Sequence, residues 1–429
     1  MKTGRKFIFG LITALGILAS AEGLLTVYSG YSGQDWRVNP LPAHPEYSVI
    51  CEFGDMLRLC PDQGPKYERV RPEVFFKEKT GQRVITIGES FVFGLGLPAD
   101  DSWPGQLKAR LGENVEVLNM GRCGTYASRL IPILKAALTL DPDVIVLSTG
   151  NNEHTMTSFY TGPLGRQPLK SYKLMSTLGI FQTYGLLYRQ IAGPDIKFRE
   201  SFTEAPKNFE NDTDQQVYAA RRRPPNMSLF PDGLATASVT QILEQEQRLK
   251  EMIFKDHLQE MIRLSTDAGV PMILTTLPRD LAVPPVLSGV HAENETETRR
   301  IAKGLQARDP RSQEDWVSQG LSADDKVSLF LYERGMIALR EGNLKEAAKW
   351  IRRNISWELV PDATPEINQI VRDLAVKNQL QLIDLDVYAE QYLTNPQTIF
   401  LDKVHVNARG ASEIADQVAP AIQSVLNPN

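Results

Sequence analysis

Residues 83–90 read RVITIGES, an apolar β-strand pattern that runs directly into a Gly-Glu-Ser turn. The pattern recurs as VEVL at 115–118 and as VIVLS at 144–148, and each of these strands also leads into a glycine-containing turn. Helices are predicted between the strands, over about 103–111 and about 126–140. Apolar strands that alternate with helices are typical of a parallel sheet with helices on both faces. The sequence therefore predicts a doubly wound α/β fold.

The polar residues that follow these strands are expected at one edge of the sheet. Ligands of doubly wound sheets bind beyond the carboxyl ends of the strands. Ser90, the 119–125 loop and Asn152 all lie just after predicted strands, so we expect them on one rim. A later strand at 271–276 (PMILTT) ends near Arg279, which could reach the same rim and contact a substrate.

The rest of the chain continues this core and interrupts it. A strand at 380–384 and a helix at about 408–425 complete the pattern at the C-terminus. Residues 326–355 predict a helical hairpin similar to one tetratricopeptide unit, which we interpret as an insert packed on the main domain because one unit cannot form an array. The predicted domains are a hydrophobic leader at 1–28, a juxtamembrane cap or stalk at 29–80, an α/β core at 81–160 and 378–429, and an insertion at 161–377 that includes core elements at about 239–280 and the hairpin at about 326–355.

Composition narrows the function classes. The 429 residues suit one large domain with insertions or two domains, and 42% of them are hydrophobic. The formal net charge of −5 argues against a dedicated nucleic-acid binder, which is usually basic. No Cys-x-x-Cys pair or Cys/His cluster indicates a metal site, and no cofactor is expected.

The first residues have the pattern of an export signal. Lys2, Arg5 and Lys6 precede an apolar run at 7–21. The small-x-small sequence at 19–21 would suit cleavage by a signal peptidase, whereas a helix continuing to Tyr28 would be long enough to span a bilayer. A buried helix of a soluble protein is the third interpretation. We expect the membrane anchor, with the rest of the chain outside the cytoplasm because the basic residues lie on the N-terminal side.

Cysteine usage leaves one question open. Cys51 and Cys60 bracket a short loop, and in an exported chain they could form a disulfide. Two reduced, buried cysteines are the alternative. Cys123 is left without a predicted partner.

Ser90 is the candidate nucleophile. A serine hydroxyl needs an adjacent base, and a tight strand-to-helix turn would hold it on the rim. The backbone N–H groups of Ser90 and Gly124 and the side-chain amide of Asn152 are candidate donors to the oxyanion of an acyl-transfer reaction. Each signal alone has a structural alternative, because serine often caps helices and glycine and asparagine are common in loops.

The candidate base comes from the far end of the chain. His405 lies just before the C-terminal helix with Asp402 three residues upstream, a spacing that lets the carboxylate orient the imidazole. His154, beside Glu153, is a rival base or a residue that lines the pocket. His257 lies within a long predicted helix, where a structural or solvent-exposed side chain is expected.

Four sequence blocks of this chain, taken in chain order, resemble those of the SGNH (GDSL-type) hydrolase family. The resemblance covers about 83–155 and 378–425. The blocks are Gly88-Glu89-Ser90, Asn119…Gly124, Gly150-Asn151-Asn152-Glu153 and Asp402…His405.

The resemblance implies a flavodoxin-like fold and a role for each matched residue. Ser90 would be the nucleophile, with Gly124 and Asn152 completing an oxyanion hole around its N–H group. His405 would be the general base and Asp402 its partner.

The chain departs from the family pattern at two positions. Glu89 stands where the family has an aspartate before the serine, and Glu153 stands where it has an aspartate after the asparagine. Both residues keep a carboxylate and are possible pocket residues. The hydrophobic leader and the helical hairpin further resemble the membrane-anchored bacterial members of the family.

These observations predict an extracytoplasmic serine esterase or deacetylase. Its substrates would be O-acyl esters of small molecules, envelope polysaccharide or lipid, and it would contact the membrane through the N-terminal helix. An O-acyltransferase that uses the same triad with a sugar acceptor is the alternative. A non-catalytic protein that docks a protein partner through the helical insert is a third hypothesis.

Overall fold

The computed structural model describes residues 2–32, 49–60, 74–153, 183, 186, 228–229, 237–285, 287–288, 295–306, 313–357 and 364–427. The chain divides into two compact units. Residues 1–47 and 157–207 form the first unit, and residues 48–156 and 208–429 form the second, which contains the predicted α/β core.

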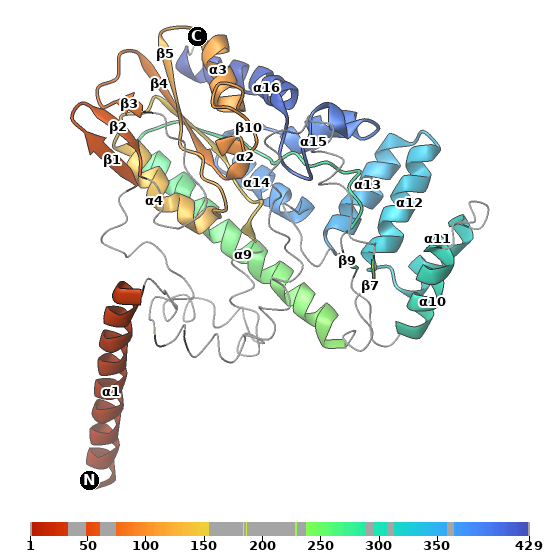
Figure 1. Cartoon of the computed structure of the whole chain (residues 1–429), viewed down its shortest axis with the longest axis horizontal. Helices are drawn as coiled ribbons and strands as arrows, with labels where there is room; N and C mark the ends of the chain where they lie inside the picture. The colour runs from red at the N-terminus through yellow and green to blue at the C-terminus, as the bar shows by residue number, and fades with distance from the viewer. Residues whose placement is uncertain are drawn as a thin grey trace. The chain divides into compact units, whose positions relative to one another are not determined.

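A five-stranded parallel sheet forms the centre of the second unit (Figure 1). Its strands, numbered in chain order, are arranged 2-1-3-4-5, the strand order of flavodoxin-like sheets. The predicted doubly wound fold is therefore confirmed. In order across the sheet the strands are β10 (Gln381–Ile383), β8 (Met272–Thr275), β6 (Val144–Ser148), β4 (Gln82–Gly88) and β5 (Val115–Asn119).

Helices cover both faces of this sheet. Because successive side chains of a strand point to opposite faces, Ile85 and Ile87 of β4 join the core on one face, whereas Val84 joins the core on the other. The helices on the first face are α4 (Ala127–Leu138), α9 (Ala237–Asp267) and α14 (Pro365–Lys377). The helices on the second face are α3 (Trp103–Leu111) and α16 (Ala408–Leu426).

A small antiparallel sheet lies within the region predicted as a cap or stalk. Its strands are β1 (Ile50–Phe53), β2 (Met56–Leu59) and β3 (Val74–Phe76). Leu57 and Leu59 are buried in the same core as Leu118 of β5, so the small sheet packs on the α4 face of the main sheet. Cys51 and Cys60 form a disulfide across the β1–β2 hairpin.

Helices from the insertion form further small cores. The predicted hairpin consists of α12 and α13, which approach closely: a Cβ atom added to Gly335 would lie 2.5 Å from Ile351. The helices of this region are α10 (Glu295–Gln306), α11 (Gln313–Ala323), α12 (Ser328–Arg340) and α13 (Leu344–Ile355). Shorter elements complete the unit: α2 (Ser90–Phe93), β7 (Ser228–Leu229), β9 (Leu287–Ser288), α15 (Leu385–Ala389), η2 (Glu390–Tyr392) and η3 (Pro396–Thr398).

The first unit contains the N-terminal helix α1 (Lys2–Ser32). Glu22 of α1 accepts hydrogen bonds from the backbone N–H and the hydroxyl of Thr183, both at 2.8 Å. The sequence predicts a membrane anchor here. Within the part of the chain that the structure describes, no helix has both the length and the apolar character to cross a membrane.

Candidate active site

The Gly-Glu-Ser turn lies at the carboxyl end of β4 and begins helix α2. Glycine is required at position 88, because a Cβ atom there would lie 2.2 Å from the backbone oxygen of Ser148 at the end of β6. Glu89 keeps an extended backbone, with φ −94° and ψ −157°, and α2 starts at the next residue. The sharp change from strand to helix places Ser90 on the rim of the sheet, where it is 7% exposed.

His405 reaches Ser90 from the opposite end of the sequence. Its Nε2 atom lies 2.8 Å from the Ser90 hydroxyl oxygen. The loop that carries His405 is fixed by its own backbone, because Leu401 N–H donates to the carbonyl of His405 at 2.7 Å and Phe400 forms an antiparallel bridge with Val406. Two residues 315 positions apart thus come within hydrogen-bonding distance.

Asp402 orients the imidazole. His405 Nδ1 lies 2.8 Å from Oδ2 and 2.9 Å from Oδ1 of Asp402. Oδ1 also accepts the backbone N–H groups of Val404, at 3.0 Å, and of His405, at 2.8 Å. Because an ionised carboxylate only accepts hydrogen bonds, Nδ1 carries the proton and Nε2 presents its lone pair to Ser90. That tautomer can remove the hydroxyl proton.

The loop after β5 is attached to the nucleophile turn. Asn119 Nδ2 donates to the carbonyl of Val92 at 3.0 Å, and Arg122 N–H donates to the carbonyl of Gly88 at 3.0 Å. Gly124 has φ +62°, a left-handed conformation that favours glycine. A Cβ atom there would meet nothing within 4 Å, so the backbone conformation rather than lack of space requires glycine.

Asn152 lies at the same rim, but its amide points into the protein. Nδ2 donates to Glu89 Oε2 at 2.8 Å and to the carbonyl of Thr125 at 2.9 Å. An amide nitrogen has two hydrogens, so both are engaged in this structure. Asn152 therefore ties the nucleophile turn to the loop of Gly124, and donation to an oxyanion would require one of these bonds to be exchanged.

All four sequence blocks thus meet at the carboxyl ends of β4, β5 and β6, around a Ser-His-Asp triad on a sheet of order 2-1-3-4-5. This chain is similar to the SGNH hydrolases. Both the site and the strand order carry that likeness.

Comparisons with known proteins give weaker information than the site does. No family model and no curated protein matches this chain. A GDSL-family lipolytic protein from Veillonella parvula is 11% identical with a TM-score of 0.35, over 80% of this chain and 99% of its own. An Enterococcus faecalis lipase/acylhydrolase is 12% identical (TM-score 0.35; 81% and 98% covered), as is an acetyl xylan esterase (TM-score 0.34; 79% and 99% covered). At such low identities and scores, overall superposition does not decide the activity.

Glu89, one of the two departures from the SGNH pattern, organises the Asn152 loop. Its Oε1 accepts the Thr149 hydroxyl at 2.7 Å and Gly150 N–H at 2.6 Å, and its Oε2 accepts the backbone N–H of Asn152 at 3.0 Å. Glu89 is fully buried, and this burial raises the pKa of its carboxyl group, although the hydrogen bonds from the loop act in the opposite direction. The sequence alone indicates no more than a possible pocket residue at position 89.

Glu153, the second departure, lies close enough to Glu89 for the two carboxyl groups to interact electrostatically. Its Oε1 accepts the backbone N–H of Ala127, the first residue of α4, at 2.7 Å. Burial raises the pKa of Glu153, and the neighbouring charge of Glu89 raises it further. The two glutamates therefore brace the loops of the SGNH-like site from inside the protein rather than line an open pocket.

Three other residues singled out from the sequence are Arg279, His154 and His257. Arg279 is 3% exposed, and the next residue, Asp280, donates its N–H to the carbonyl of Lys403 at 2.8 Å, so this loop adjoins the loop of His405. His154 lies outside the described residues. Burial lowers the pKa of His257 to about 4, which agrees with the structural role expected within α9.

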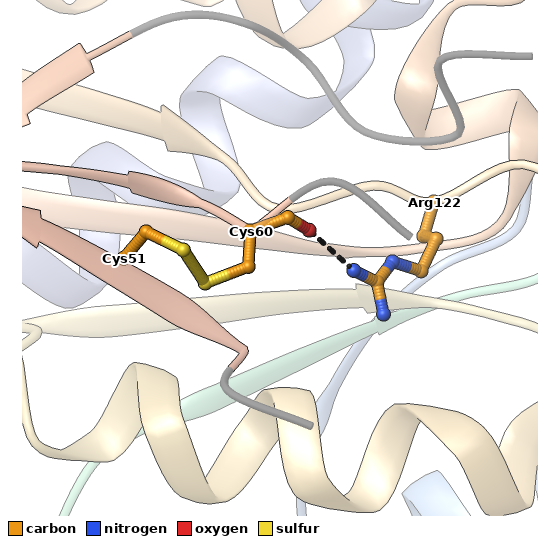
Figure 2. The surroundings of a disulfide bond; sticks show 3 residues. All are labelled: Cys51, Cys60 and Arg122. Atoms are coloured by element: carbon orange, nitrogen blue, oxygen red, sulfur yellow. Dashed lines mark hydrogen bonds between the residues drawn. A yellow bond between two sulfur atoms is a disulfide. The ribbon is translucent and has the colours of Figure 1, made fainter. Parts of the chain in front are cut away.

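A support that sequence analysis missed connects the disulfide to the loop of Gly124 (Figure 2). Nη2 of Arg122 donates to the carbonyl oxygen of Cys60 at 3.0 Å. Arg122 is 3% exposed, and burial lowers its pKa to about 10. The Cys51–Cys60 hairpin precedes the core in the sequence, and no sequence motif indicates that it packs beside this loop. Within the described residues, no cluster of His, Cys, Asp and Glu is arranged to hold a metal ion.

Proposed function

We propose that this chain is a serine esterase that cleaves O-acyl esters through an acyl-enzyme on Ser90. One observation carries the proposal: the Ser90 hydroxyl, the His405 imidazole and the Asp402 carboxylate form a continuous hydrogen-bonded series with separations of 2.8 Å. An imidazole held in one tautomer against a serine hydroxyl serves to remove that proton during nucleophilic attack.

Each step of the reaction uses the same three groups. The Ser90 oxygen attacks the ester carbonyl carbon while His405 Nε2 takes the hydroxyl proton, and Asp402 stabilises the imidazolium that forms. Collapse of the tetrahedral intermediate breaks the bond to the alcohol oxygen, which receives the proton from His405. A water molecule then attacks the acyl-enzyme and gives a proton to His405. That proton returns to Ser90 as the carboxylic acid leaves.

The substrates that we propose are O-acyl groups of polysaccharide or lipid outside the cytoplasm. The basic residues before the apolar run of α1 support export. The Cys51–Cys60 disulfide supports an oxidising compartment, because such bonds are rare where thiols are kept reduced. Fusing residues 1–48 to alkaline phosphatase tests the location, since this reporter gains activity only where its own disulfides form. An inactive fusion that is fully expressed would reject export.

Active-site labelling tests the esterase. A fluorophosphonate probe should label the wild-type chain and fail to label Ser90→Ala. With 4-nitrophenyl acetate as substrate, Ser90→Ala and His405→Ala should each lower kcat by about a hundred-thousandfold or more. Both variants should keep the wild-type Tm within a few degrees, because neither removes a large apolar side chain.

A matched variant separates loss of chemistry from damage to the loop. Lys403→Ala changes the same loop as His405→Ala but leaves the triad intact, so it should keep labelling and turnover within a fewfold of wild type. Equal probe labelling of wild type and Ser90→Ala would overturn the proposal.

A further inference from the structure

The strand β5 forms an edge of the main sheet. Among the strands that the structure describes, β5 pairs only with β4, so its other side has no described strand partner. An open edge exposes a row of backbone donors and acceptors and is a template for another strand.

The hydrogen-bonding pattern identifies which backbone groups face outward. Gln82 N–H donates to the carbonyl of Asn114, and Met120 N–H donates to the carbonyl of Thr86, both at 2.9 Å. Successive residues of a strand turn their backbone groups to alternate sides. Even-numbered residues of β5 therefore face β4, and Val117 and Asn119 turn their N–H and C=O groups away from it.

A groove of about 760 Å³ runs along this edge and is lined by all five residues of β5. Side chains of α3, on one face of the sheet, form one wall, and β3, on the other face, forms the opposite wall. The described side chains and backbone that line the walls are mainly apolar or small, and include Leu59, Val74, Phe75, Pro104 and Ala109. The open edge thus lies between two layers rather than on a flat surface.

We propose that this groove binds an extended peptide segment of a partner protein, which adds as a strand to β5. Strand addition takes affinity from the open backbone groups and selectivity from pockets for alternate side chains. Val117 and Leu118 belong to the cores on opposite faces of the sheet, and both also line the groove. A strand with apolar or β-branched side chains on both of its faces therefore matches the two walls.

The groove favours a single strand over two other occupants. A second copy of this chain would have to bring its own β5 edge past the same two walls, whereas one extended segment fits between them. A polysaccharide would find three polar side chains of the groove already hydrogen-bonded within the chain: Ser102 to Ala99, Glu116 to Arg83 and Asn119 to Val92. Asp100 and Glu113 outnumber Lys108 among the remaining charged groups, which favours basic residues in the partner.

Binding of a defined peptide to the full chain tests this proposal. The probe is fluorescein-labelled Lys-Val-Thr-Val-Thr-Val-Lys, and its fully N-methylated form is the matched control, with the same side chains but no backbone donors. The unmodified peptide should bind with a Kd below about 1 mM, and N-methylation should weaken binding at least about tenfold. Hydrogen exchange of the fragment 112–121 should slow in the peptide complex.

Two variants test whether the peptide binds in the groove. Val74→Glu puts a charge on the exposed wall of the groove and should weaken binding about tenfold. Phe53→Glu is the control, because Phe53 is similarly exposed, at 50% against 55% for Val74, but does not line the groove. Turnover of 4-nitrophenyl acetate should stay unchanged in both variants.

Several results would overturn the proposal. One is that the peptide does not bind at concentrations up to about 1 mM. Another is that the N-methylated peptide binds as tightly as the unmodified one. A third is that Val74→Glu and Phe53→Glu weaken peptide binding equally. Slow exchange of 112–121 in the free chain would mean that another part of this chain occupies the edge. If xylo-oligosaccharide slowed the hydrogen exchange of 112–121 and the peptide did not, the groove would be a carbohydrate site.

Discussion

Asp402 has two tasks at the residue scale, because its carboxylate binds the imidazole and also two backbone N–H groups of its own loop. Asp402→Asn keeps the size of the side chain but offers an N–H group toward Nδ1, which favours the wrong tautomer of His405. We expect kcat to fall by about a thousandfold to ten-thousandfold. The loss should be smaller than in His405→Ala, since Asp402 transfers no proton. Wild-type turnover of Asp402→Asn would remove Asp402 from the triad.

Glu89 gives a prediction for stability against pH. Burial raises its pKa in the folded chain above the unfolded value of about 4.3. Its contribution to stability is therefore fully present below that unfolded value and is lost as the pH rises through the folded pKa. Glu89→Gln cannot ionise, so its Tm relative to wild type should rise between about pH 4 and the folded pKa of about 7, and should level off above it. Turnover should nevertheless fall, because Gln places an N–H group against the Asn152 loop.

Glu116 is the matched control for this pH series. Its hydrogen bonds from Thr80 and Arg83 outweigh the opposing effect of burial and lower its pKa in the folded chain. Its contribution is therefore present above the unfolded pKa and is lost as the pH falls. The Tm of Glu116→Gln relative to wild type should accordingly decrease with rising pH. If the Tm differences of Glu89→Gln and Glu116→Gln from wild type changed in the same direction with pH, the assignment for Glu89 would be contradicted.

The residues of the candidate site differ in how far sequence predicts them. Ser90 and His405 could be named because each lies at a strand or helix end in a motif a few residues long. The partners of Asn152 could not be predicted, since Glu89 lies 63 positions away and its direction depends on the turn before α2. Local motifs therefore identify reacting groups, whereas the groups that orient them depend on the folded loops.

At the scale of elements, the strands and helices of the α/β core are predicted well and the small sheet is not. The strand β6 has the predicted bounds because an unbroken apolar run marks it, and α3 has them because Ser102 caps its first turn and Gly112 follows its last residue. Strands β1, β2 and β3 are three or four residues long and were not predicted. Their order comes from packing against the sheet and from the disulfide, and neither is a local property.

The disulfide hairpin gives a prediction at this scale. Cys51→Ser combined with Cys60→Ser removes a link across nine positions, which should lower the free energy of unfolding by about 2–3 kcal/mol. Because Arg122 donates to the carbonyl of Cys60, kcat should also fall severalfold through loosening of the Gly124 loop. Arg122→Met tests this route, since it should reproduce the loss of kcat while the disulfide remains. Unchanged kcat in both proteins would separate the hairpin from the site.

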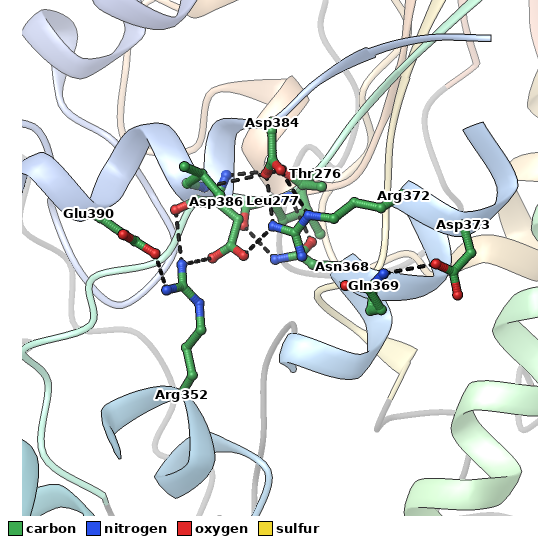
Figure 3. Close-up of polar contacts among 11 residues, drawn as sticks. Thr276, Leu277, Arg352, Asn368, Gln369, Arg372, Asp373, Asp384, Asp386 and Glu390 are labelled. Atoms are coloured by element: carbon green, nitrogen blue, oxygen red, sulfur yellow. Dashed lines mark hydrogen bonds and ion pairs between the residues drawn. The ribbon is translucent and has the colours of Figure 1, made fainter. Parts of the chain in front are cut away.

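At the scale of the second unit, a charged network connects the inserted hairpin to the sheet (Figure 3). Asp386 follows β10 and accepts Arg352 of α13 at 2.9 Å and Arg372 of α14 at 2.6 Å. Its backbone N–H donates to the Thr276 hydroxyl, beyond β8, at 2.9 Å. Residues from four separate segments thus meet at Asp386, and no spacing in the sequence indicates this meeting.

The Asp386 carboxylate also gives a prediction for the free energy of unfolding. The Asp386 side chain is 6% exposed. Asp386→Asn removes the partner that Arg352 and Arg372 share, although Arg352 keeps Glu390 and Arg372 keeps Asp384, so the free energy of unfolding should fall by about 2 kcal/mol. Arg352→Met should cost less, because Asp386 keeps Arg372 and the methionine preserves packing. Arg353→Met on the same helix is the control: its partner Asp325 is 58% exposed, and such pairs contribute at most about 1 kcal/mol. Urea unfolding measures all three. If Arg353→Met cost as much as Asp386→Asn, the network would not be what holds the hairpin on the sheet.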